Sequence, residues 1–80
     1  MEKLEKTSYQ LVMLISSISN NEQGINCTIT KEPDNLGFCN IRISYINKDI
    51  LNLISKHNFS INNITPHKLK EELNISIKFC

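Results

Sequence analysis

The feature that most constrains the fold is a regular alternation of apolar and polar residues across positions 24–46. Apolar side chains take every second position on both sides of a polar connection, residues 31–36, that contains Pro33. A repeat of two places successive side chains on opposite faces of an extended strand. The sequence therefore predicts two half-buried antiparallel strands, at residues 24–30 and 37–46, with one apolar and one polar face.

The alternation also assigns the side chains of this hairpin to faces. The expected inward set is Ile25, Cys27, Ile29, Cys39, Ile41, Ile43 and Tyr45. The expected outward set is Asn26, Thr28, Thr30, Asn40, Arg42 and Ser44. Pro33 and Asp34 fit the centre of a type I turn, and Gly37 gives the chain freedom just after it.

Helical periodicity and capping residues place the remaining elements. Apolar residues at three- and four-residue spacing predict an amphipathic helix over residues 2–20. Asn47 is a good N-cap for a second helix that ends near His57. Thr65 and Pro66 fit the N-cap and first position of a short third helix, residues 66–73. Residues 59–61 and 74–80 alternate again, and we expect the latter to join the hairpin as a third strand.

The predicted order is therefore α-β-β-α-(β)-α-β. Eighty residues are enough for one domain, which we expect to span residues 1–80. Strands interrupted by helices indicate an α+β two-layer sandwich, with a small antiparallel sheet of three to four strands and helices on one face.

Composition and charge narrow the class of protein. Ile, Asn and Lys supply 32 of the 80 residues, which indicates a low-GC genome. The formal net charge is +1, with the carboxylates weighted towards residues 1–40 and the cations towards residues 41–80. The first residues carry charges of both signs, and the apolar run behind them, residues 11–15, is short. We therefore expect no signal peptide, no membrane-spanning helix and a cytoplasmic protein.

The sequence contains no pattern that specifies a metal, a cofactor or a catalytic site. Cys27, Cys39, His57 and His67 are separated by eleven, seventeen and nine residues, whereas zinc ligands come in closely spaced pairs. A Cys27–Cys39 disulfide and a position of Cys39 beside His57 are left open. With two glycines in the chain, a phosphate-binding loop is excluded. We expect no cofactor, no metal and no enzyme activity.

Binding of a macromolecule is the function that remains. If helices cover one side of the sheet, its polar face is bare, and a strand edge can pair with another chain, including a second copy. The predicted binding residues are the outward Asn40, Arg42 and Ser44, the acidic hairpin tip, and lysines of the C-terminal half: Asn40, Arg42, Ser44, Glu32, Asp34, Lys56, Lys68 and Lys70.

Small size, Ile/Asn/Lys-rich composition and the lack of a catalytic pattern are typical of phage or mobile-element proteins that bind and inhibit a host protein. Anti-CRISPR and other anti-defence proteins have this character, although no residue pattern matches a particular family. The sequence thus favours a protein-binding inhibitor. The alternatives are a nucleic-acid-binding or regulatory module that uses Arg42 and the C-terminal lysines, and a small subunit or adaptor of a larger complex.

Overall fold

A computed structural model describes residues 2–21 and 24–79 of the chain. Their elements are α1 (Glu2–Asn21), β1 (Cys27–Lys31), β2 (Phe38–Ile43), α2 (Lys48–Lys56), β3 (Phe59–Pro66) and β4 (Leu73–Phe79). The protein has the predicted α+β fold, with two helices and a four-stranded antiparallel sheet in the described residues.

The sheet has the strand order β1-β2-β4-β3, and every neighbouring pair is antiparallel. β2 and β4 are therefore the inner strands, and β1 and β3 form the edges. Ile41 marks the centre, because it lies opposite Ile29 of β1 on one side and Ile75 of β4 on the other. The predicted pairing of the C-terminal strand with the hairpin is confirmed, and β4 pairs with β2.

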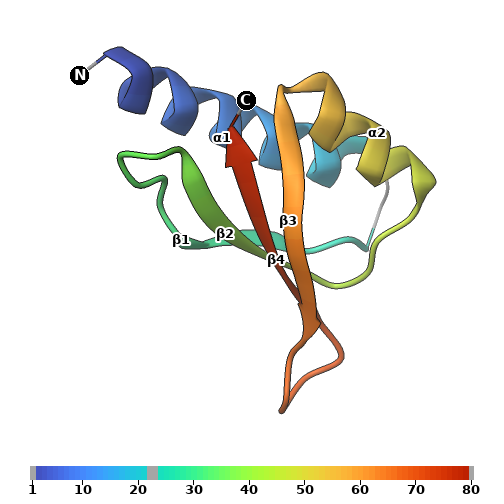
Figure 1. Cartoon of the computed structure of the whole chain (residues 1–80). Coiled ribbons are helices and arrows are strands. Elements are labelled where there is room, and N and C mark those ends of the chain that lie inside the picture. The colour runs from blue at the N-terminus through green and yellow to red at the C-terminus, as the bar shows by residue number, and fades with distance from the viewer. Residues whose placement is uncertain (1, 22–23, 80) are drawn as a thin grey trace.

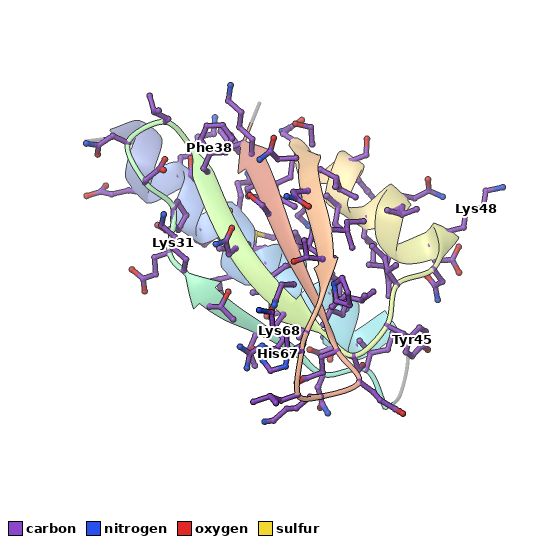
Figure 2. All side chains as sticks on the ribbon, turned by 60° about the horizontal axis from the view of Figure 1, so that its bottom comes forward. Lys31, Phe38, Tyr45, Lys48, His67 and Lys68 are labelled. Atoms are coloured by element: carbon purple, nitrogen blue, oxygen red, sulfur yellow. The ribbon has the colours of Figure 1, made fainter. Side chains whose placement is uncertain are left out.

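Both helices lie on the same face of the sheet (Figure 1). Each contributes an apolar side to one buried cluster, which the inward residues of the strands complete. The members with no exposed surface are Leu11, Leu14, Ile18, Cys39, Ile41, Ile43, Ile75 and Ile77. The other face of the sheet is left without a helical layer, as Figure 2 shows from that side.

The start of α2 follows the predicted capping chemistry. Asn47 Oδ1 accepts the backbone N–H of Ile50 at 2.9 Å, which satisfies a donor that has no partner inside the helix. Asp49 in the first turn and Lys56 in the last turn complement the helix dipole. The buried side chains of the helix are Ile50 and Ile54.

The third helix predicted for residues 66–73 is wrong. Residues 59–66 form the eight-residue strand β3, and a loop follows that closes through a hydrogen bond from His67 N to Glu72 O. A helix this short is marginal in water, and both of its predicted ends belong to strands instead, because Pro66 at the end of β3 pairs with Leu73 at the start of β4. Pro66 is tolerated because it lies at the end of an edge strand.

The hairpin turn is also displaced from its predicted position. The backbone bond runs from Gly37 N to Asp34 O, so Asn35 and Leu36 are the central residues, instead of Pro33 and Asp34. Asp34 Oδ1 accepts the N–H groups of Leu36 and Phe38, a local bond that favours aspartate at the first turn position. The positive φ of 88° at Gly37 explains the glycine.

The ends of the two strands predicted for the hairpin differ from the structure. β1 begins at Cys27 and β2 ends at Ile43, so Ile25 and Tyr45 lie outside the strands. Cys80 lies outside the described residues.

Replacement of Ile41 by alanine should destabilise the protein by about 2–5 kcal/mol, because it leaves a cavity at the centre of the core. Ile29→Ala is the matched control, since Ile29 lies directly opposite Ile41 but is 37% exposed on an edge strand. The control should cost clearly less in urea unfolding followed by circular dichroism. Equal losses would contradict this position of the core.

Candidate binding surface

The sheet face opposite the helices, here called the open face, is polar and continuous across all four strands. Strand registers align its side chains in three rows, Thr28–Arg42–Asn74–Thr65, Lys31–Asn40–Ser76–Asn63 and Phe38–Lys78–Ser60. At a strand spacing of about 4.8 Å, such rows bring side chains from distant parts of the chain into one surface. The β-bulge after Ile29 puts Lys31 opposite Asn40, so Lys31 takes an outward position in the register after Thr28, where the alternation predicted Thr30.

A shallow hollow of about 240 Å³ lies in the middle of the open face. Its lining is almost wholly amide and hydroxyl, from Asn40, Asn63, Thr65, Asn74 and Ser76, with Ile75. A second hollow, of about 570 Å³, shares Thr65 and Asn74 with the first and extends along the β3–β4 loop to Leu69. The two form one depression, here called the trough, which is mainly polar between the strands and mainly apolar along the loop, where Pro66 and Leu69 line it.

Arg42 lies beside the trough and is held by a neighbour within its own row. Its Nε donates to Asn74 Oδ1 at 3.4 Å. In the described part of the chain this is the one side-chain bond that the guanidinium makes, so its terminal N–H groups are available for a carboxylate or a phosphate.

The charged residues of the open face have one sign. Lys31, Arg42 and Lys78 occupy outward positions in the three registers, and none of the outward positions in these registers is acidic. Lys78 Nζ lies 5.3 Å from the centroid of the half-buried Phe38 ring, a cation–π distance. The open face therefore attracts anionic groups, although the whole chain carries a net charge of +1.

The β3–β4 loop, residues 67–72, protrudes beyond the helices at the lower end of the molecule (Figure 1). His67 organises it: Nδ1 accepts the backbone N–H groups of Leu69 at 3.1 Å and Lys70 at 3.2 Å. An imidazole nitrogen that accepts must be unprotonated, so the other nitrogen carries the proton. At the apex Leu69 is 88% exposed between Lys68 and Lys70. His67 and Lys68 lie at the lower end of the open face (Figure 2).

The predicted binding residues fall into two groups. Asn40 and Arg42 lie on the open face, and Lys68 lies in the loop at its end, so the structure brings these three to one side of the molecule. Lys70 belongs to the same loop but lines a different hollow, together with Glu71 and Glu72. The hydroxyl of Ser44 accepts Asn26 N–H beside them and helps to close the start of β1.

The remaining predicted residues lie elsewhere. Glu32 lines a small hollow against α1 on the helix side of the sheet. Asp34 is occupied by the backbone of its own turn, and Lys56 lies in the last turn of α2 within the helical layer.

Several residues of the surface are absent from the predicted set, for two different reasons. Asn74 and Ser76 were on the polar side of a recognised alternation, so their place beside Arg42 follows once β4 pairs with β2. Asn63 lies beyond the short strand predicted for residues 59–61, and Thr65, His67 and Leu69 were assigned to the N-cap and body of the wrong helix.

The two buried cysteines have thiols with raised pKa values. Burial raises the pKa of the Cys27 thiol to about 11, and burial followed by the charge of Asp34 raises the pKa of the Cys39 thiol to about 11. Cys39 Sγ donates weakly to Ile77 O, and His57 Nδ1 lies 2.9 Å from Leu53 O, so the two side chains are engaged separately. Such thiols are poor nucleophiles at neutral pH.

The disulfide left open by the sequence does not form. Cys27 lies opposite Ile43, four residues along β2 from Cys39, a separation of roughly 13 Å at about 3.3 Å per residue. A disulfide requires Cα atoms within about 7 Å, and both thiols are free. Among residues 2–21 and 24–79, no three His, Cys, Asp or Glu side chains gather as a metal site.

Neither helix of the described chain has the length and apolar character needed to cross a membrane. Comparisons with protein families, with curated proteins and with solved structures find no match to this chain.

Stability should fall between pH 9 and pH 11 because of the two thiols. Their ordinary pKa is 9.0 and the folded value is about 11, so below pH 9 both folded and unfolded chains hold the protons. Between these values the unfolded thiols ionise first, which favours unfolding. Urea unfolding at several pH values should show a smaller fall for Cys27→Val/Cys39→Val, which retains the lysines and tyrosines. Equal slopes would contradict the raised thiol pKa values.

His67→Ala should loosen the loop without unfolding the sheet. Loss of the Nδ1 acceptor leaves the N–H groups of Leu69 and Lys70 without their partner, so their hydrogen exchange should accelerate about fivefold, as expected for a bond worth about 1 kcal/mol. His67→Asn is the matched control, because an asparagine oxygen can accept the same groups in an Asx turn. NMR exchange rates that stay the same in His67→Ala would show that the imidazole does not organise the loop.

Proposed function

We propose that the protein is a non-catalytic binding domain that docks on another protein through its open face and the adjoining β3–β4 loop. The observation that carries the proposal is Leu69, the most exposed of the large apolar side chains, at the apex of an ordered and protruding loop. An apolar side chain held in water by its own loop gains free energy when a partner covers it.

The charges around Leu69 define the surface that it fits. Lys68 and Lys70 flank it in the loop, and Arg42 and Lys78 follow on the open face. We infer a partner with an apolar pocket bordered by carboxylates, because a complementary rim speeds association and excludes basic surfaces. The amides and hydroxyls of the trough supply the hydrogen bonds that a polar interface needs.

Inhibition of the partner is the mode of action that we favour. The described residues hold no cluster that could bind a metal, their two buried thiols have raised pKa values, and an 80-residue domain can still cover a functional site on a larger protein. A phage or mobile-element origin, anti-defence proteins included, agrees with the composition and remains part of this proposal.

Single-stranded nucleic acid is the second candidate partner. It is favoured by the basic charge and the amide floor of the open face, together with the half-buried ring of Phe38, which can stack on a base. The exposed Leu69 argues against it, since an apolar apex gains nothing from a phosphate backbone.

Affinity capture tests the proposal with matched variants. Tagged wild-type protein and Leu36→Asp should retain one partner from an extract of the cells in which the gene is found, identified by mass spectrometry. Leu36 is the control because it is 67% exposed in the other hairpin loop. Leu69→Asp and Arg42→Glu should each reduce capture at least tenfold, by an unfavourable charge in the apolar pocket or against the acidic rim.

Capture that is unchanged in both variants would contradict this interface. Binding of a 15-nucleotide single strand, measured by fluorescence anisotropy, separates the second candidate. If the affinity is high, falls steeply between 50 and 200 mM salt and is lost in Arg42→Glu but not in Leu69→Asp, nucleic acid is the partner.

A further inference from the structure

A second concave surface lies on the opposite side of the β3–β4 hairpin from the open face. This hairpin groove, of about 390 Å³, runs between the chain just after β2 and the loop. Its walls are mainly apolar and include Tyr45, Pro66 and Leu73. Leu73 lies opposite the buried Ile43, which places it on the helix side of the sheet, where it is partly buried against the edge of the core. Tyr45 lies beside the base of the hairpin (Figure 2).

Glu72, which lines this groove, has one buried carboxylate oxygen without a hydrogen bond. Glu72 Oε1 is inaccessible to solvent and has no partner among the described residues. An acceptor removed from water without a donor costs free energy, and more so when it is charged. Glu71, its neighbour in sequence, also lines the groove but is exposed.

Loop closure fixes the position of this carboxylate. Glu72 N donates to Lys70 O at 2.8 Å, and Glu72 O accepts from His67 N at 2.8 Å. The backbone of Glu72 is thus tied on both sides, and Leu73 begins β4 directly after it. These bonds fix the backbone of Glu72, so a change of backbone conformation does not easily move its side chain into solvent.

We propose that the hairpin groove binds an arginine side chain of a partner protein, with Glu72 as its carboxylate. A guanidinium supplies the donors that Oε1 lacks, and it pairs with a carboxylate through two parallel bonds. The aliphatic stem of an arginine fits walls made of Pro66 and Leu73, and its planar head stacks well on a tyrosine ring such as Tyr45.

This site is separate from the proposed function, although Pro66 and His67 line both the groove and the trough. It lies on the other side of the hairpin and selects the opposite charge, so it can fail while the open face still binds, and the reverse also holds. Lys70 is the competing cation within the chain, because it too lines the groove. The test must therefore separate an external arginine from Lys70 and from an ordered water.

The probe is N-acetyl-arginine-N-methylamide, titrated into the full chain and followed by ¹⁵N NMR at Tyr45, Glu72 and Leu73. Its neutral isostere, N-acetyl-citrulline-N-methylamide, is the control ligand. We expect saturable shifts with arginine, of roughly millimolar affinity for so small a ligand, and at least tenfold weaker binding of citrulline. This comparison uses wild-type protein, so it stands even if a variant fails to fold.

Variants assign the binding to Glu72. Glu72→Gln should weaken arginine binding at least tenfold, whereas Glu71→Gln, the matched neighbour, should change it less than twofold. Equal binding of citrulline, equal losses in the two variants, or no shift with either ligand would overturn the proposal; in the last case a water satisfies Oε1. A gain of more than tenfold in Lys70→Met would show that Lys70 occupies the groove, which would also overturn it.

Discussion

The antiparallel pairing of β2 with β4 is the contact on which the rest of the structure depends. It joins the hairpin at residues 27–43 to the C-terminal segment through six paired positions, and it forms the centre of the sheet. Ile41, Ile43, Ile75 and Ile77 line the inner side of this pair, and both helices pack against the cluster that they form. The same pairing turns Asn40, Arg42, Asn74 and Ser76 to the other side. Core and binding surface are thus two faces of one strand pair.

This origin explains why the surface is both polar and ordered. The outward side chains of β2 and β4 are held by strands whose central inward side chains are fully buried, so their positions are fixed without packing of their own. A partner therefore meets a surface that loses little conformational freedom on binding, and preorganisation of this kind increases affinity. The β3–β4 loop differs, because the sheet ends before it and its order comes from His67 and from the bond between His67 N and Glu72 O.

Local patterns predict most of this fold, because strand alternation and helix caps depend on neighbours in sequence. The amphipathic α1, the capped α2 and the outward position of Arg42 all follow from such patterns. The region around residues 62–73 does not, since Thr65-Pro66 is as good a helix start as it is a strand end, and only pairing with β4 decides between them. The exposed position of Leu69 and the contact between His67 and the loop both depend on whether Thr65 and Pro66 end a strand or begin a helix. A buried carboxylate oxygen without a hydrogen bond, such as that of Glu72, cannot be recognised from the sequence. Its lack of a partner depends on which donors the folded chain places too far away.

The manner in which His67 holds the loop has an evolutionary consequence. Its ring nitrogen binds the main-chain N–H groups of residues 69 and 70, which every amino acid except proline possesses. The side chain at the apex takes no part in these bonds and contributes nothing to the core. Residue 69 can therefore change from leucine to an aromatic, a charged or a small residue while the loop keeps its shape. Single substitutions at residue 69 can therefore adapt the loop to a partner protein whose sequence diverges, and the fold that presents the loop is kept.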